Sequence, residues 1–240
     1  MALPQQITEL GDFDQVTYPE GHRHYVFPIN PDKLYTSVTT LLNSDIPDFV
    51  MAKYHKRVGG QDEAERQMEL MRCIGNAFDS AIQKAINYGE YTHPALQKLG
   101  YPEGTKFHTQ VPLAHHDLLY MGTCDILVEC LDGTWDVVDT KAWSKFYSPE
   151  DEKEDEGLGL LDRTLSTAKI DKARKQLCLY ALAFEHLSGI KPTNLQVLHF
   201  CPHTFTYNTS GLSWQYQSNR TQKSIRETII PLCKLGQKEC

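Results

Sequence analysis

Two carboxylates and a lysine lie close together around one predicted turn. Asp125 ends the run Gly-Thr-Cys-Asp at 122–125, and Asp139 and Lys141 lie fourteen and sixteen residues after it. Apolar residues follow the first aspartate and precede the second, which predicts two strands, and the Asp-Gly pair at 132–133 predicts a hairpin between them. Paired carboxylates can hold a divalent cation, and a nearby lysine can offset charge on a phosphate. The group therefore has the residue types needed to hold a metal against a phosphodiester.

The hairpin register decides whether the two aspartates can act together. A two-residue turn at 132–133 would place their side chains on opposite faces. A three-residue loop at 131–133, with Gly133 in the left-handed conformation, would set Asp125 opposite Asp139 with β-carbons roughly 5 Å apart. Lys141 would share their face, because side chains alternate along a strand. We predict the three-residue loop; the simpler alternative is that each aspartate is only a turn or capping residue.

A third element lies in the helical pattern that runs from Lys169 to Leu187. Gln176 and Tyr180 are four residues apart, so their side chains project from one helix face. An ordinary amphipathic helix, with a glutamine and a tyrosine at the border of its core, is the alternative interpretation.

Taken in order, Gly-x-x-Asp at 122–125, Asp-x-Lys at 139–141 and Gln-x-x-x-Tyr at 176–180 resemble the RecB-type branch of the PD-(D/E)xK nucleases. That branch includes lambda-type exonucleases, mitochondrial genome maintenance exonucleases and CRISPR-adaptation nucleases. The similarity covers roughly residues 35 to 187 and is specific in the hairpin and in the Gln-x-x-x-Tyr helix. It implies an α/β fold with a restriction-endonuclease-like mixed β-sheet flanked by helices.

The resemblance also implies roles for these residues. Asp125 and Asp139 would bind Mg²⁺ or Mn²⁺ together with the backbone carbonyl of Thr140, and Lys141 would hold or help activate the attacking water. The glutamine and the tyrosine of the helix would steady the DNA strand. The implied activity is metal-dependent DNA hydrolysis, with exonuclease attack on single- or double-stranded DNA ends as the favoured mode. DNA recombination and repair are settings that fit such an enzyme.

An upstream helix extends the resemblance. The family has Gly-Thr-x-x-His-x-x-x-Glu before the hairpin, and this chain has Gly-Asn-Ala-Phe-Asp-Ser-Ala-Ile-Gln at 75–83. Asp79 replaces the histidine, which commonly binds metal in the family, and its oxygens suit Mg²⁺. Gln83 replaces the glutamate and is not expected to bind metal, because its side chain is neutral. Gln110 likewise stands where relatives often have glutamate.

The segment Tyr-Thr-Ser-Val-Thr-Thr-Leu-Leu at 35–42 is similar to the Ser/Thr-rich start of these nuclease domains. Ser37 and Thr39 are candidates for binding DNA phosphates, because hydroxyls and backbone amides at a helix start suit phosphate oxygens. The alternative is that Ser37 or Thr36 is simply the N-cap of a helix that runs through Leu42.

A chain of 240 residues can form one large α/β domain. We expect an N-terminal extension with a short hairpin over residues 1–34 and a nuclease domain over 35–240, with an acidic loop inserted at about 147–160. No apolar run is long enough to span a membrane, and the N-terminus lacks signal or transit character. We therefore expect no membrane association, and a cytoplasmic or equivalent reducing compartment rather than secretion.

The net charge of −7 is unusual for a protein that binds DNA. Residues 150–156 hold six acids and one lysine, so they contribute −5 and leave −2 for the rest of the chain. This stretch is a candidate site for a protein partner, a gate over the channel, or only a loop. Cations gather at 53–57 and 169–175, which favours a basic channel around the site over two solvated helix faces.

Cysteines and histidines give weaker signals. The seven cysteines include no Cys-x-x-Cys pair, which favours buried free thiols over a disulfide or a metal or iron–sulfur site. The adjacent His115 and His116 fall between two strand-like runs, and we interpret them as part of a turn rather than as a ligand set.

Hydrophobic periodicity places the remaining elements. A hairpin is predicted at 15–28 with its turn at 18–21, and helices are predicted near 38–43, 47–58, 62–88 and 218–235. Strands are predicted near 106–113, 118–130 and 134–142, with one or two more within 195–207.

Two other functions remain open at this point. A DNA-binding or partner-binding module with reduced catalysis would account for the departures at Asp79 and Gln83, but the complete set of two hairpin aspartates and Lys141 argues against it. A structure-specific endonuclease would use the same residues if the channel did not enclose a DNA end.

Overall fold

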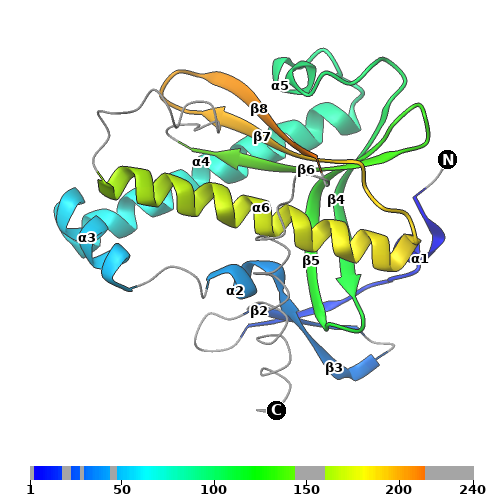
Figure 1. Ribbon diagram of the computed structural model, residues 1–240, viewed down its shortest axis with the longest axis horizontal. Helices are drawn as coiled ribbons and strands as arrows, with labels where there is room; N and C mark the ends of the chain where they lie inside the picture. The colour runs from blue at the N-terminus through cyan, green and yellow to red at the C-terminus, as the bar shows by residue number, and fades with distance from the viewer. Residues whose placement is uncertain (1–2, 18–22, 28–29, 44–47, 144–159, 214–240) are drawn as a thin grey trace.

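In the part of the chain that the structure describes, eight strands form one mixed β-sheet with helices on both faces (Figure 1). The computed structural model describes residues 3–17, 23–27, 30–43, 48–143 and 160–213. The strand order is β1-β2-β3-β5-β6-β7-β8, with β4 paired to β5 outside this path. The expected α/β class with a mixed sheet and flanking helices is confirmed at this level.

The elements have the following bounds. The strands are β1 (Asp14–Thr17), β2 (Arg23–Phe27), β3 (Asn30–Ser37), β4 (Lys106–His115), β5 (Tyr120–Glu129), β6 (Trp135–Ala142), β7 (Asn194–Cys201) and β8 (Thr206–Ser213). The helices are α1 (Gln5–Thr8), α2 (Val38–Asn43), α3 (Asp48–Val58), α4 (Gln61–Asn87), α5 (Pro94–Lys98) and α6 (Leu160–Ser188).

The two long helices cover opposite faces of the sheet. Leu177 and Phe184 of α6 belong to one apolar cluster, which includes Val137 of β6. Ile82 of α4 belongs to a second cluster, which includes Val138, the next residue of β6. Successive side chains of a strand point to opposite faces, so the adjacent Val137 and Val138 contribute to both layers. In Figure 1, α6 crosses in front of the sheet and α4 lies behind it.

Strand β5 lies at the centre of the sheet, and on one of its edges two different strands pair with different parts of it. Along one edge β4 pairs with it over its whole length, from Tyr120 to Glu129. On the other edge, β3 pairs in parallel with residues 120–121 and β6 pairs antiparallel with residues 126–129. Residues 122–125 therefore form no ladder pair with either strand on this edge. The Gly-x-x-Asp motif lies in this gap.

Most of the elements predicted from periodicity are confirmed, including the β1–β2 hairpin strands and the helix over 38–43. Helix α6 begins at Leu160, nine residues before the predicted start, and β3 was not predicted as a strand. The turn at 18–21, the acidic loop at about 147–160 and the helix near 218–235 lie outside the described residues. None of the described helices is long and apolar enough to cross a membrane.

None of the five described cysteines is in a disulfide. Cys124, Cys178 and Cys201 are buried. Cys73 is exposed, which corrects the expectation of burial: it lies on α4 at a position that faces away from the sheet.

Candidate active site

The β5–β6 hairpin has the predicted three-residue loop. The Cys130 N–H donates to the Thr134 carbonyl at 2.9 Å, which closes the ladder on either side of residues 131–133. Gly133 has φ of 82°, the left-handed conformation that glycine adopts without steric cost. The pairs run from Glu129 with Trp135 to Ile126 with Val138, so the next position in this register sets Asp125 opposite Asp139.

The Asp125 carboxylate replaces backbone pairing where the two strands separate. Its Oδ2 accepts hydrogen bonds from the Thr140 backbone N–H at 2.8 Å and from the Thr140 hydroxyl at 3.0 Å. The Asp125 side chain thus takes the place of a β5 backbone carbonyl as the acceptor for the Thr140 N–H, at the point where the β5–β6 ladder ends. Hydrogen bonds from Thr140, on the neighbouring strand, hold Asp125 at the gap.

Asp79 reaches the same place from α4, on the other side of the sheet from α6. Its Oδ1 accepts from the Thr140 hydroxyl at 3.2 Å, so Thr140 links Asp79 to Asp125. Its Oδ2 accepts from the Gln83 amide at 2.6 Å and from the Gln110 amide at 3.2 Å. The amides of Gln83 and Gln110 therefore orient the Asp79 carboxylate.

Gln110 occupies a strained position on β4. Its φ is 52°, which is uncommon for a residue other than glycine. The β4–β5 ladder is interrupted there, between the pairs Thr109 with Ile126 and Val111 with Cys124, so Gln110 is opposite Asp125. The irregularity gives the Gln110 side chain its contact with Asp79. Strained backbone of this kind is concentrated at functional sites.

Asp139 is fully buried and forms an ion pair with Lys141, whose side chain is 22% exposed. Neither Asp139 oxygen accepts a hydrogen bond from the described residues. Lys141 Nζ also donates to the Thr140 carbonyl at 3.2 Å, so the carbonyl predicted as a metal ligand is in contact with the lysine. Asp139 therefore has one described cation, the Lys141 ammonium, and a second carboxylate, Asp125, beside it.

Burial and mutual repulsion shift the pKa values of the acids upward. Desolvation raises the pKa of Asp139, partly offset by Lys141, and the Asp125 charge raises it further. Desolvation and then the Asp125 charge raise the pKa of Asp79. Desolvation acts to lower the pKa of Lys141, but the carboxylates of Asp139 and Asp125 outweigh it and raise that pKa. A second cation at these acids would relieve the same repulsion.

The donor set fits a hard divalent cation. Carboxylate oxygens are the ligands that Mg²⁺ and Mn²⁺ prefer, and Asp139 Oδ1 is buried with no described hydrogen bond, while Oδ2 is paired with the Lys141 ammonium. The three acids are not packed as one tight cluster, because the only described His, Cys, Asp or Glu triplet with all ligand atoms within 4.8 Å is His115, Asp117 and His186. The Thr140 hydroxyl and the Lys141 ammonium occupy the space among the acids.

Gln176 and Tyr180 project together from α6, as predicted, and are buried. The Gln176 amide donates to the Tyr180 hydroxyl at 3.1 Å. Desolvation raises the pKa of Tyr180, and the charges of Asp125 and Asp139 raise it further, which places the ring next to the acids. Both side chains are more than nine-tenths buried, so they lie next to the acids on the interior side of the site.

Ser37 serves as a helix cap, which was the alternative to phosphate binding. Its hydroxyl accepts from the Thr40 N–H at 3.0 Å, the N3 position of α2, and its side chain is buried. Thr39 is 3.1 Å from the Ser37 hydroxyl and accepts from the Arg23 guanidinium at 2.8 Å. These contacts join α2 to β2 and account for both hydroxyls without a phosphate.

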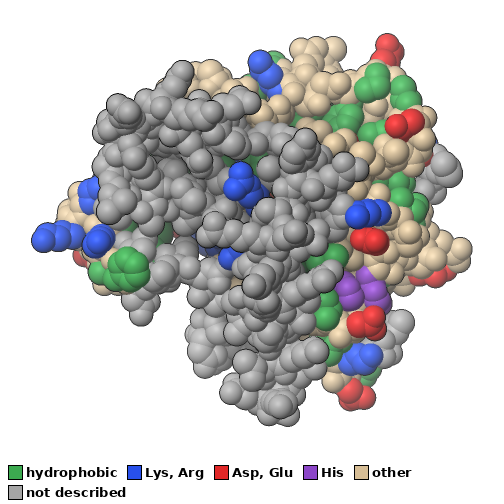
Figure 2. All heavy atoms as spheres, in the orientation of Figure 1, with side chains coloured by type: hydrophobic (Ala, Val, Ile, Leu, Met, Phe, Trp, Pro, Cys, Tyr) green, Lys and Arg blue, Asp and Glu red, His purple; other side chains and the backbone are tan. Residues whose placement is uncertain are grey.

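The two predicted basic stretches approach each other in space. Lys53, Lys56 and Arg57 lie on α3, and Lys169 lies on α6, seven residues before Gln176. Desolvation lowers the pKa of Lys169, and the charge of Arg57 lowers it further. Figure 2 shows Lys and Arg side chains over α3, at the left of the view, and others near the centre of the same face.

Sequence reasoning missed several contributors to this site. It assigned Thr140 a backbone carbonyl role, whereas the Thr140 hydroxyl and N–H connect two acids. It gave Gln83 and Gln110 no role, although their amides hold Asp79. Their positions relative to the family motifs were the available signal. No family model and no curated protein matches this chain.

Proposed function

We propose that this protein is a Mg²⁺- or Mn²⁺-dependent deoxyribonuclease of the PD-(D/E)xK type, with a restriction-endonuclease-like fold, that hydrolyses phosphodiester bonds from DNA ends. One observation carries the proposal: Asp79, Asp125, Asp139 and Lys141 converge where β5 and β6 separate. They come from three different elements of the chain. A merely structural carboxylate at this place would not require a second and a third beside it, since each raises the free energy of the others' charged form.

The acids and the lysine have complementary parts in such a reaction. Asp125 and Asp139 are the principal metal ligands, and Asp79 adds a third carboxylate from α4. A divalent metal bound there would polarise the scissile phosphate and lower the pKa of a water molecule. Lys141 is beside the same acids and would hold the attacking water and offset charge that develops on the phosphate.

The surrounding elements suit a polyanionic substrate. Helix α3 and helix α6, which carry the two groups of cations, are in contact. A cationic surface of this kind attracts the DNA backbone independently of sequence. Gln176 and Tyr180 are buried beside the acids. They would therefore hold the acids in place rather than contact DNA bases.

Degradation of end-labelled linear DNA tests this function directly. Wild type is compared with Lys141→Ala and with Lys98→Ala, an exposed lysine on α5 that serves as the matched control. Each protein is incubated with Mg²⁺, with Mn²⁺ and with chelator. Covalently closed circular DNA of the same sequence is included as a parallel substrate.

We expect wild type and Lys98→Ala to degrade the linear DNA only with added metal, and Lys141→Ala to be inactive while still folded. Sparing of the circle identifies an exonuclease, and nicking of the circle identifies an endonuclease at the same site. Retention of DNA binding without cleavage by wild type contradicts the enzyme and favours a catalytically reduced binding module.

A further inference from the structure

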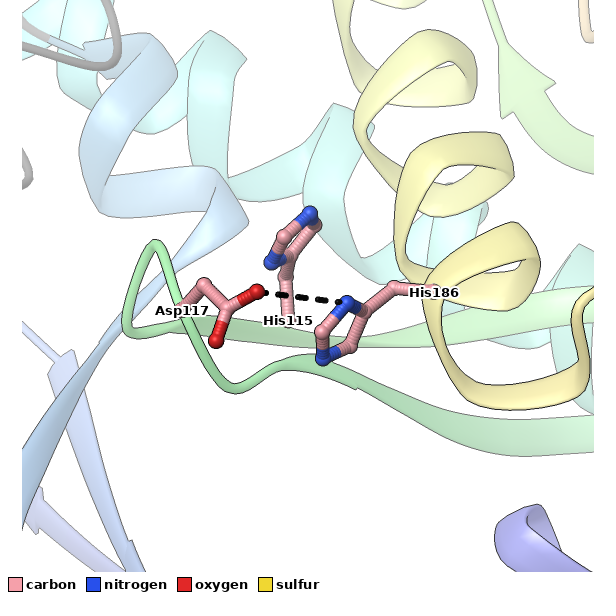
Figure 3. A group of neighbouring side chains, drawn as sticks. All are labelled: His115, Asp117 and His186. Atoms are coloured by element: carbon pink, nitrogen blue, oxygen red, sulfur yellow. Dashed lines mark ion pairs between the residues drawn. The ribbon is translucent and has the colours of Figure 1, made fainter.

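A second group of possible metal ligands lies at the far end of the β4–β5 hairpin. His115 is the last residue of β4, Asp117 lies in the connection to β5, and His186 lies in the last turn of α6. One ligand atom from each residue lies within 4.8 Å of the others. Figure 3 shows the three side chains directed toward one another from the hairpin and the helix.

The two imidazoles are in close contact. Their ring centroids are 4.1 Å apart with an interplanar angle of 15°. His186 Nδ1 is 3.8 Å from Asp117 Oδ2. Nδ1 of His115 is buried and has no hydrogen-bond partner among the described residues. Ring stacking therefore brings the histidines together but leaves one strongly polar ring nitrogen unsatisfied.

We propose that His115, Asp117 and His186 form a binding site for a divalent transition metal, zinc above all. Two imidazole nitrogens and one carboxylate oxygen are a ligand set that zinc accepts, whereas Mg²⁺ prefers oxygen alone. Three protein ligands leave a fourth tetrahedral position for water. This site is separate from the carboxylate site at Asp125 and does not depend on the proposed nuclease function.

Zinc binding requires the three ligand atoms to move closer together and the stacked imidazoles to turn, so that a nitrogen of each ring points at the same ion. Metal–ligand distances of about 2 Å require ligand atoms roughly 3.3 Å apart, closer than the present limit of 4.8 Å. The Asp117 side chain is 82% exposed and is free to turn toward the imidazoles.

A metal at this site would join the hairpin to α6. His186 follows Tyr180 by six residues, or about 9 Å along the helix axis. A cross-link there would fix the helix that carries Gln176 and Tyr180 against the central strand β5. His116 supports the same corner of the fold, since the Tyr35 hydroxyl lies 2.9 Å from its Nδ1. The adjacent histidines are thus more than the turn that the sequence suggested.

Zinc binding by tag-free, chelator-stripped protein tests the site. Bound Zn²⁺ is measured by equilibrium dialysis with elemental analysis, and thermal unfolding is followed with and without Zn²⁺. Asp117→Asn and His186→Ala each remove one ligand. His203→Ala, an exposed histidine in the β7–β8 turn, is the matched control, and Asp139→Asn disables the carboxylate site. Circular dichroism confirms that each variant is folded.

We expect wild type, His203→Ala and Asp139→Asn to share one zinc equivalent that raises their unfolding temperature. Asp117→Asn, at an exposed position that cannot disturb the core, loses this equivalent and its thermal shift, and so does His186→Ala. The proposal is overturned if wild type binds no zinc, if both ligand variants keep the equivalent, or if only Asp139→Asn loses it. None of these outcomes depends on DNA cleavage.

Discussion

Gly122 and Tyr180 meet at the gap in the edge of β5: a β-carbon added to Gly122 would lie 2.7 Å from Cε1 of Tyr180. The same atom would lie 3.0 Å from the buried side chain of Val38. The glycine of the Gly-x-x-Asp motif is therefore a packing requirement, because only a residue without a side chain leaves room for the tyrosine beside the acids.

Gly122→Ala is expected to lower the free energy of unfolding by about 1–3 kcal/mol, because the extra methyl group overpacks a closed contact. Gly75→Ala is the matched control, since an added β-carbon in that helix meets nothing within 4 Å. That change should stabilise by up to about 1 kcal/mol through helix propensity. Urea unfolding of both variants measures the difference, and equal effects would refute the packing role.

The ion pair between Asp139 and Lys141 should show strong energetic coupling. Lys141→Met leaves a fully buried carboxylate without its cation and is expected to cost about 3 kcal/mol. Asp139→Asn combined with Lys141→Met should cost less than Lys141→Met alone, because no uncompensated charge then remains. A double-mutant cycle by chemical unfolding gives the coupling energy.

The pair between Lys106 and Glu129 provides the comparison for this cycle. Its closest approach is 3.5 Å and the Lys106 side chain is 51% exposed. Solvent screens the Lys106 ammonium, although the Glu129 side chain is only 7% exposed, so Lys106→Met should cost less than Lys141→Met. A cost of Lys141→Met no larger than that of Lys106→Met would contradict a buried ion pair at the site.

Removal of cations from α3 should weaken DNA binding in a salt-dependent way. If Arg57 neutralises one phosphate, Arg57→Ala lowers the slope of log affinity against log salt by about 0.9 for duplex DNA. Lys98→Ala, on α5, should leave that slope unchanged. Fluorescence anisotropy across a salt series in Ca²⁺ or chelator measures both, and an unchanged slope in Arg57→Ala would exclude α3 from the DNA path.

A buried polar network around Asp136 should be important for stability. The Tyr101 hydroxyl donates to Asp136 Oδ2 at 2.7 Å and accepts from Gln196 Nε2 at 2.9 Å. Tyr101→Phe leaves the buried Asp136 and the half-buried Gln196 each with one bond fewer, so we expect a loss of about 1–3 kcal/mol. Tyr88→Phe is the control, because Tyr88 is 78% exposed and should show no loss. Thermal unfolding distinguishes the two.

His199 should make stability sensitive to acid. It is fully buried, and desolvation lowers the pKa of its ring below the ordinary value of 6.5 even though its hydrogen bond to the Trp143 carbonyl opposes the shift. The unfolded chain then binds protons before the folded chain does, so stability is complete above pH 6.5 and falls as the pH decreases toward the lowered pKa.

His199→Gln removes this titration and keeps an N–H donor for the Trp143 carbonyl. The stability of wild type relative to His199→Gln should therefore decrease as the pH falls from 7.5 to 5.5. Unfolding free energies measured in urea at several pH values give this difference. A difference independent of pH would show that the ring does not titrate on unfolding.

Local sequence determined the elements and the register of the hairpin. Periodicity of apolar residues specified the strands from β4 to β6 and the long helices, because burial of one face requires it. The Asp-Gly pair with one preceding residue specified the loop, since only glycine adopts the φ of 82° at Gly133 at no steric cost. That loop alone sets Asp125 opposite Asp139, so the centre of the candidate site was predictable.

Tertiary structure decided which distant residues complete that site. Asp79 and Thr140 are sixty-one residues apart and meet only because α4 packs behind β6. The division of the β5 edge between β3 and β6, and the irregular backbone of Gln110, arise from pairings between segments that are remote in the chain. Likewise His186 reaches His115 only through the packing of α6 on β4. Local periodicity carries no information on such contacts, because it specifies which face of an element is buried but not which segment covers it.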